Sequence, residues 1–235
     1  MQSIFSDETP ATLSCVKNYE GRNVALDALI PTEVKLALDV GCGRGGNAAF
    51  LKQLGIEVDG VSWNEAELAV AKAFCRRVIR CDLNDGLSNI ESETYDLIIC
   101  SHLLEHIAYP QTLLRDLYRS LHPEGYLLVA IPNLFFWSDR LKLLSGKWNY
   151  AESGTFDYSH LRWYSDQSMR NLLKEYDFVV DHFLADGWIP LPGLKFVIGS
   201  KLRAGINRAA CLWRPSLFGC QLIYRCRKRL HSLTK

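Results

Sequence analysis

A glycine-rich stretch preceded by an acidic residue is the part of this sequence best suited to bind a ligand. It runs from Leu36 to Gly46, LALDVGCGRGG, and leads from an apolar strand pattern into an amphipathic helix pattern. Glycines at 41 and 43 let the backbone turn sharply and approach a ligand closely, and a helix N-terminus offers N–H groups and partial positive charge. The turn therefore predicts a nucleotide-binding site. Asp39 would repel a pyrophosphate, so it favours a cationic ligand.

The run LDVGCGRGG resembles the first motif of the class I methyltransferases that use S-adenosylmethionine (SAM), and the resemblance covers residues 19–184. Within that family the chain is similar to type 11 and type 12 members, including members found with surface-glycan assembly and in the methionine pathway. The resemblance implies an α/β, Rossmann-like, doubly wound fold with a seven-stranded sheet and an antiparallel final hairpin. It implies SAM as the cofactor, held first by Asp39, Gly41, Cys42 and Gly43.

Ligands of open α/β sheets bind beyond the carboxyl ends of the strands, so the residues after each predicted strand are the next candidates. After the second strand come Ser62 and Trp63, where nucleotide sites usually place an acid for the ribose hydroxyls. Methyltransferases that resemble fatty-acid cyclopropane synthases also have a hydroxyl residue here and use a side chain five residues later, which is Glu67 in this chain. Asp59 and Glu65 are weaker substitutes for the missing acid.

The ends of the third and fourth strands supply further candidates through the same resemblance. Asp82, followed by Leu83, stands where the family has an acid that accepts the adenine amino group. The run SHLLEHIAYP matches the family's motif after the fourth strand and would place Ser101 and His102 beside the SAM sulfonium and the substrate. Methyl transfer needs in-line alignment of nucleophile, methyl carbon and sulfur. An alcohol nucleophile also benefits from a base, which His102 could supply.

A metal pair is an alternative interpretation of this run, because His102 and His106 lie four residues apart. The sequence shows no evident third ligand for them, and we expect no metal site. A core or capping role for His106 is as good an interpretation as a catalytic one.

A second candidate base lies in FDYSHLRWYS, where this family often carries Asp-x-x-His-x-Arg followed by an aromatic residue. His160, Arg162 and Tyr164 alternate, so on an extended segment they would share one face. That face could offer the acceptor a base, an anion-binding guanidinium and a hydroxyl. A salt-bridged lid is the alternative. We therefore name His102, His160 and Arg162 as the candidate catalytic residues.

The elements that must position these residues alternate between strand and helix. Strand patterns cover residues 36–40, 56–61, 77–83, 95–101 and 126–132, and helix patterns cover residues 19–30, 47–54, 64–74 and 111–121. This alternation predicts a parallel sheet with helical crossovers. Farther along, we expect helices at 134–144 and 166–176, a strand at 178–185, and a last strand at 219–228 that runs antiparallel to its predecessor.

These elements predict one domain over residues 1–235 with three additions. They are an N-terminal extension and helix (1–30), a substrate-side lid (134–165), and a basic amphipathic insertion before the last strand (187–218). The run HPEG before the fifth strand is expected to be a turn.

Charge is distributed unevenly along the chain. All 26 acidic residues lie at or before Asp186, whereas 10 of the 27 basic residues follow it. In residues 188–218 basic side chains alternate with apolar ones, a composition that suits an anionic membrane surface better than nucleic acid. A solvated helix face packed on the sheet is the alternative.

The cysteine pattern and the lack of targeting signals predict the cellular location of the protein. Its 8 cysteines form no C-x-x-C pair, which favours reduced thiols over a disulfide framework or a zinc site. The N-terminus has no signal-peptide pattern, and no apolar run reaches the length of about 18 residues that a membrane span needs. We expect a cytoplasmic protein, with peripheral contact at the inner membrane face as a further hypothesis.

The function that follows is SAM-dependent methyl transfer, by direct displacement at the methyl carbon, to a small-molecule or lipid-linked glycan acceptor through a hydroxyl. Two other functions are considered. A SAM-binding protein without catalysis, acting as a regulator or partner, is left open by the missing acid at Ser62. An NAD(P)-dependent enzyme is disfavoured by Asp39 and Ser62.

Overall fold

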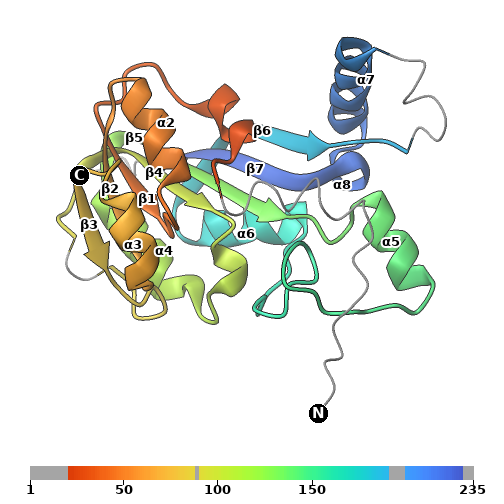
Figure 1. The fold of residues 1–235 in the computed structure, drawn as a ribbon, viewed down its shortest axis with the longest axis horizontal. Helices are drawn as coiled ribbons and strands as arrows, with labels where there is room; N and C mark the ends of the chain where they lie inside the picture. Colours follow the sequence, from red (N-terminus) through yellow and green to blue (C-terminus); the bar gives the residue numbers. More distant parts are fainter. Residues whose placement is uncertain (1–20, 88–89, 191–198, 230–235) are drawn as a thin grey trace, which may run out of the picture.

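The chain folds around one seven-stranded sheet with helices on both sides (Figure 1), in a computed structural model that describes residues 21–87, 90–190 and 199–229. The strand order is β3-β2-β1-β4-β5-β7-β6. The strands are β1 (Leu36–Val40), β2 (Glu57–Ser62), β3 (Arg77–Arg80), β4 (Tyr95–Ser101), β5 (Leu121–Pro132), β6 (Phe178–Gly187) and β7 (Gly219–Lys228). The first five strands run parallel to one another, as the alternating pattern predicted.

Helices lie at all six predicted positions; four are shorter than predicted, and two are shifted by one residue toward the N-terminus. The helices are η1 (Val24–Leu29), α2 (Gly46–Gln53), α3 (Glu65–Ala71), η2 (Leu104–His106), α4 (Pro110–Ser120), α5 (Trp137–Leu144), α6 (Asp166–Glu175), α7 (Ser200–Trp213) and α8 (Pro215–Phe218). The helix expected at 19–30 is a short 3-10 helix that begins after Asn23, whose side chain accepts a hydrogen bond from the N–H of Ala25. Residues 1–20, which include most of the expected N-terminal extension, lie outside the described residues.

One further expectation differs from the structure. The run HPEG does not form a turn ahead of the fifth strand but lies within β5. The pairing of β4 with β5 skips there, from Tyr95 opposite Leu121 to Leu97 opposite Tyr126. The extra residues are absorbed as an irregularity at the start of the strand, a common way for a strand to bend without losing its pairing.

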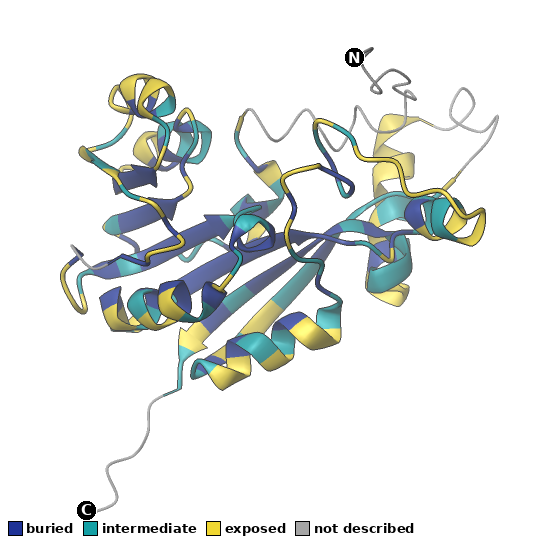
Figure 2. Cartoon of the chain, turned by 90° about the horizontal axis from the view of Figure 1, so that it is seen from below, coloured by how far each residue is buried: buried dark blue, intermediate teal, exposed yellow. Residues whose placement is uncertain are grey.

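Apolar side chains on the two faces of the sheet form separate core layers. Leu26 and Leu29 of η1 and Ala48 and Leu51 of α2 pack on one face. On the other face the core includes α4 and α6, with Leu113, Leu117, Met169 and Leu173. Figure 2 shows the central strands buried between helices whose outward faces are exposed, whereas the edge strands β3 and β6 are only partly buried. Because the crossovers cover both faces, ligands can reach the sheet only beyond its strand ends.

The last strand confirms the predicted antiparallel hairpin. β7 is inserted between β5 and β6 and runs antiparallel to both. In this register Gln221 lies opposite Pro132 of β5 and opposite Asp186 of β6. The insertion therefore carries a polar residue from near the end of the chain to the carboxyl end of β5.

The basic segment before β7 folds in part as α7 and α8, while residues 191–198 lie outside the described part of the chain. In Figure 1, α7 projects from the end of β6 and β7, away from α2 and α3. Across residues 21–87, 90–190 and 199–229, no helix has both the length and the apolar character needed to cross a bilayer.

Candidate functional site

The glycine turn after β1 has the conformation that its sequence predicted. Gly41 and Gly43 have positive φ, at 75° and 51°, values that glycine adopts without steric cost. The N–H groups of Gly41 and Cys42 both donate to the carbonyl of Val61, at 2.9 Å, which ties the turn to the end of β2. A Cβ on Gly43 would meet open space. The turn thus leaves backbone accessible at Gly43.

Asp39 lies buried beneath this turn, with 1% of its surface exposed. The Asn47 side chain hydrogen-bonds to its carboxylate, but Oδ2 has no hydrogen-bond partner among the described residues. Burial raises the pKa of Asp39 to about 7, against the smaller lowering effect of Asn47. A buried carboxylate with an unsatisfied oxygen is costly and is relieved by a bound cation. The site therefore fits a ligand such as SAM, which carries a sulfonium and an ammonium group.

The end of β2 joins two of the predicted cofactor residues. The Ser62 hydroxyl donates to Oε2 of Glu67 at 2.8 Å and accepts from the N–H of Asn64 at 3.2 Å. Asn64 also caps α3 by accepting from the N–H groups of Ala66 and Glu67. The Glu67 carboxylate is thus held at the end of β2, where Ser62 stands in place of the usual acid. Trp63, beside it, is 70% exposed.

The two weaker substitutes for this acid are engaged elsewhere. Asp59 is fully buried and accepts hydrogen bonds from Arg76, Arg77 and Tyr95. Although burial raises the pKa of Asp59, these hydrogen bonds together hold it below its usual value. Glu65 is exposed and pairs with Arg80 at 2.7 Å. Neither carboxylate is available for a ribose.

The candidates at Asp82, Leu83 and Cys42 differ in what they can offer. Asp82 is exposed after β3 and accepts from the backbone and the side chain of Asn84, and these hydrogen bonds lower its pKa. Leu83 is buried in the core. The Cys42 thiol packs against Gly60, and burial raises its pKa, so it stays protonated. Asp82 can contact a ligand through its side chain, whereas the side chains of Leu83 and Cys42 serve packing.

A buried polar network crosses the carboxyl ends of the central strands, and no pattern in the sequence predicted it. Asn23 donates through Nδ2 to Ser101 Oγ at 3.1 Å and to Gln221 Oε1 at 2.9 Å, and its backbone N–H donates to Asn47 Oδ1 at 3.0 Å. Gln221 Oε1 also lies 3.0 Å from Nε2 of His102. The network links Asp39, through Asn47, to the candidate base at position 102. Its members come from positions up to 198 residues apart, and Asn23, Asn47 and Gln221 are not among the predicted site residues.

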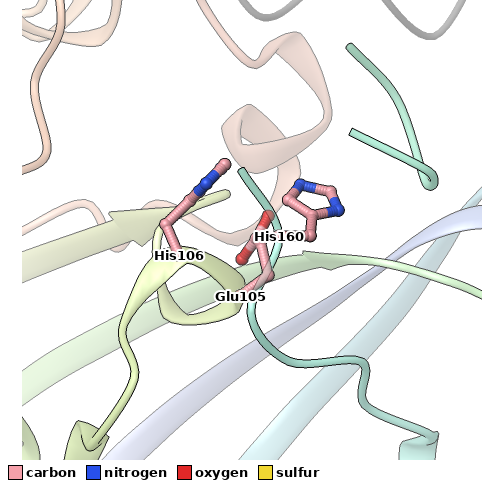
Figure 3. Close-up of side chains that lie close together, drawn as sticks. All are labelled: Glu105, His106 and His160. Carbon is pink, nitrogen blue, oxygen red and sulfur yellow. The ribbon is translucent and has the colours of Figure 1, made fainter. Parts of the chain in front are cut away.

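Glu105 lies between three histidines and was missed as a site residue. Its carboxylate is fully buried, 3.4 Å from Nδ1 of His102. Burial raises the pKa of Glu105, but the hydrogen bond from His102 and the electrostatic interactions with His102 and His106 together hold it below its usual value. His106 and His160 lie side by side, with ring centroids 4.7 Å apart. Figure 3 shows Glu105 between these two imidazoles. The candidate bases His102 and His160 thus approach one carboxylate from two directions.

His160 is held in one orientation by the irregular segment around it. It is 3% exposed, and its Nδ1 lies 3.1 Å from the carbonyl of Thr155. Burial lowers the pKa of His160, outweighing the nearby Glu105 charge. A carbonyl only accepts, so Nδ1 carries the proton and Nε2 carries the lone pair. The imidazole is neutral near pH 7, as a base must be.

The prediction that His160, Arg162 and Tyr164 share one face is wrong, because this segment is not an extended strand. The N–H groups of Leu161 and Arg162 both donate to the carbonyl of Glu105, at 2.8 and 3.0 Å. Arg162 Nε donates to the carbonyl of Ala108 at 2.7 Å. Tyr164 is buried in the core, with its hydroxyl directed at the carbonyl of Leu104. The segment is therefore fastened to the loop after β4, and Tyr164 does not reach an acceptor.

Comparison with known proteins identifies the family of the chain. The family model for the methyltransferase domain matches residues 23–182. Among curated proteins, the ubiquinone biosynthesis O-methyltransferase of Coxiella burnetii is 28% identical over 141 residues, which cover 57% of this chain and 60% of that protein. The protein of that name from Pseudomonas entomophila is 30% identical over 113 residues, 46% of this chain and 49% of its own length. The chain thus matches only about half to three fifths of these relatives.

Solved structures show the same fold. A SAM-dependent methyltransferase from Archaeoglobus fulgidus superposes with a TM-score of 0.61 at 20% identity, covering 87% of this chain and 91% of its own. One from Mesorhizobium loti gives 0.59 at 19% identity, covering 87% and 96%. With the glycine turn, the buried Asp39 and the family match over most of the chain, the protein belongs to the methyltransferase domain family, the class I methyltransferases whose cofactor is S-adenosylmethionine.

Proposed function

We propose that this protein transfers the methyl group of SAM to a hydroxyl oxygen of its acceptor. The observation that carries the proposal is the placement of His102 and His160 about the buried Glu105, directly beyond β4. This loop also contacts the cofactor turn, because a Cβ on Gly41 would lie 3.1 Å from the Leu103 side chain. A hydroxyl held between the imidazoles and the turn can lose its proton to a histidine as it attacks the methyl carbon.

The SAM-binding residues we propose are those that the fold gathers at one edge. Asp39 and the backbone of Gly41, Cys42 and Gly43 face the amino-acid and sulfonium part, and Glu67, held by Ser62, takes the ribose hydroxyls. Asp82 faces the adenine. The role of Glu67 is tested by the SAM affinity of Glu67→Gln against that of Glu65→Gln, since only the first variant should bind more weakly.

The acceptor we propose has an apolar portion as well as a hydroxyl. The curated relatives are named for O-methylation in ubiquinone biosynthesis. In addition, an apolar groove with a volume of about 560 Å³ runs between α7, α8 and the segment after β6, lined by Ile189, Pro190, Ile206, Ala209, Ala210, Trp213 and Phe218. Acceptors with an isoprenoid or other lipid chain, including lipid-linked glycans, are therefore the first to test.

The decisive assay follows formation of S-adenosylhomocysteine together with the mass gain of one methyl group on the acceptor. Phenolic and sugar hydroxyls attached to lipid chains are compared with the same molecules already O-methylated. Turnover with the free hydroxyl and none with the blocked one is expected. SAM binding without turnover on any hydroxyl acceptor would favour the non-catalytic SAM-binding role that the sequence left open.

His160→Ala should reduce kcat by roughly a hundredfold or more, within the usual contribution of a general base, while changing SAM affinity less than about threefold. The reason is that His160 contacts Thr155 and His106 and takes no part in the glycine turn. Steady-state kinetics and calorimetric SAM titration measure the two effects. His122→Ala, an exposed histidine on β5, is the matched control. Equal losses of turnover and SAM affinity would contradict a role in the chemical step.

We further propose that α7 lies on an anionic membrane surface. The helix and its C-terminal end expose Leu202, Leu212 and Trp213, at 62%, 72% and 71%. Exposed Lys201, Arg203, Arg208 and Arg214 accompany them, and no acidic residue follows Asp186. Basic residues near an anionic surface contribute about 1 kcal/mol each, and exposed apolar side chains can insert between headgroups.

This surface is tested with sedimented vesicles of anionic and of zwitterionic lipid. Binding to the anionic vesicles alone, weakened by salt, is expected. Trp213→Ala combined with Leu212→Ala should reduce it severalfold, whereas Leu144→Ala on α5, 85% exposed, should not. Equal binding of the parent and all these variants to anionic vesicles would show that α7 does not contact the membrane.

A further inference from the structure

We propose that Glu105, His106 and His160 form a binding site for a divalent transition-metal ion. One possible ligand atom from each residue can be chosen so that all three lie within 4.8 Å of one another. Two of the residues belong to η2, and the third comes from the irregular segment 54 positions later. Figure 3 shows the three side chains grouped on one side of the loop after β4.

The hydrogen bonds of the two imidazoles orient them as metal ligands. Nδ1 of His106 lies 3.3 Å from the carbonyl of Ser159 and 3.1 Å from its Oγ, whose hydroxyl donates to Asp157. Nδ1 of His160 lies 3.1 Å from the carbonyl of Thr155. Carbonyl oxygens only accept, so each Nδ1 carries its proton and each Nε2 carries the lone pair. Histidines that bind metals in proteins characteristically donate their other N–H to a backbone carbonyl in this manner.

The two halves of the site are fixed to each other by the main chain. The carbonyl of Glu105 accepts from the N–H groups of both Leu161 and Arg162, and Arg162 Nε donates to the carbonyl of Ala108. These bonds hold the segment that carries His160 against the loop that carries Glu105 and His106. A site assembled in advance loses less conformational freedom when an ion binds.

His102 positions the carboxylate and is not itself a ligand in this proposal. Its Nδ1 lies 3.4 Å from Oε1 of Glu105, while its Nε2 contacts Gln221. The sequence had suggested a pair of His102 with His106 and no third ligand. The fold instead provides the third ligand from the segment around position 160, which periodicity along a helix could not reveal.

The ligand set points to Zn²⁺ and its neighbours in the first transition row. Two imidazole nitrogens and one carboxylate oxygen suit Zn²⁺, Co²⁺ or Mn²⁺, whereas Mg²⁺ and Ca²⁺ prefer oxygen alone. A tetrahedral ion with bonds of about 2.1 Å holds its ligands about 3.4 Å apart, so the ligand atoms, which lie within 4.8 Å of one another, need to close by up to about 1.4 Å. Three protein ligands leave a fourth position open.

That open position gives the ion a chemical role, which rests on the proposed function. An acceptor hydroxyl bound there would lose its proton more easily, because a divalent cation lowers the pKa of a bound oxygen. His160 would then act as a ligand, and His102, the other candidate base beside Glu105, would accept the proton of the hydroxyl. Metal binding itself depends on neither SAM nor the acceptor, so it can be measured separately.

The test uses the full chain without a histidine tag, stripped of metal with a chelator and titrated with Co²⁺ alone. Visible absorption of tetrahedral Co²⁺, saturating at one ion per chain and lost on addition of Zn²⁺, is expected. Glu105→Gln, His106→Gln and His160→Gln should each weaken Co²⁺ binding at least about a hundredfold, since even the loss of an outer partner costs 10- to 100-fold. His122→Gln should bind as the parent does. Circular dichroism and SAM titration establish that each variant is folded.

Three results would overturn the proposal. They are absence of the visible band, unchanged binding in folded His160→Gln, and intense near-ultraviolet absorption that indicates cysteine thiolate ligands. A saturable band together with failure of every hydroxyl acceptor would leave the metal site standing and remove the proposed function. Turnover that survives complete removal of metal would leave the proposed function standing and show that the ion has no role in the reaction.

Discussion

Replacing Asp39 with asparagine should weaken SAM binding at least about a hundredfold and yet raise the melting temperature of the ligand-free protein at pH 8. Burial raises the pKa of Asp39 from 3.8 to about 7. The folded state therefore binds a proton at Asp39 more tightly than the unfolded chain does. The free energy of unfolding falls as the pH rises from 3.8 to about 7. Asparagine is neutral at every pH and removes the cost, but it also removes the charge that attracts the cationic cofactor. Calorimetric titration and thermal unfolding at pH 6 and pH 8 measure both effects.

The same pKa gives the parent protein a pH-dependent affinity. SAM should bind more tightly at pH 8 than at pH 6, because the ionised carboxylate is the form that a cation stabilises. Asp39→Asn should lose this dependence. Glu124→Gln should keep it, because Glu124 is an exposed acid near the start of β5, away from the strand ends that carry the site. Undiminished SAM affinity in Asp39→Asn would show that the buried charge is not part of the cofactor site.

Gly46→Ala should lower the melting temperature markedly and weaken SAM binding, although alanine is a better helix former than glycine. A Cβ on Gly46 would lie 2.5 Å from the carbonyl carbon of Gly21 and 2.6 Å from the backbone nitrogen of Arg22. These are backbone atoms and cannot rotate away, so the segment that leads to Asn23 has to move. Overpacking of this kind typically costs about 1–3 kcal/mol, and displacement of Asn23 would also break the network to Ser101 and Gln221.

Gly205→Ala is the matched control for this variant. Gly205 lies within α7, and a Cβ there would meet nothing within 4 Å. Its replacement should leave SAM binding unchanged and stabilise the helix by roughly 0.5–1 kcal/mol. Thermal unfolding and SAM titration of the two variants together separate a general glycine effect from the contact at Gly21. Equal behaviour of the two would contradict the steric argument.

The parts of the site that the sequence predicted are those encoded by local patterns. Gly41 and Gly43 follow directly on a strand pattern, and a turn with positive φ at both positions is what their spacing requires. The link from Ser62 to Glu67 spans a strand end and the first turn of a capped helix, so five residues of sequence suffice to specify it. The last strand was also recognisable, because apolar and polar residues alternate through Gly219–Lys228.

The parts that were missed depend on pairing between distant segments. Asn23 precedes a weak helix pattern and Gln221 lies within a strand, and neither has a neighbour in sequence that indicates a buried polar role. Only the strand order places them together, 198 residues apart in sequence. Tyr164 was misplaced for a related reason, since alternation predicts a shared face only where the backbone is extended, and here it turns around the carbonyl of Glu105.

The insertion of β7 between β5 and β6 has a consequence for the order of events during synthesis. Within the described residues β6 pairs with β7 alone, so at the ribosome the strands up to β5 can associate while β6 waits for residues 219–228 to emerge. Pairings so distant in sequence raise the contact order and slow folding, and they leave the edge of β5 open to other chains meanwhile. Because Gln221 belongs to β7 and bonds to Asn23, the polar network at the carboxyl ends of the central strands forms last. SAM should consequently stabilise the finished chain far more than any nascent fragment that ends before residue 219.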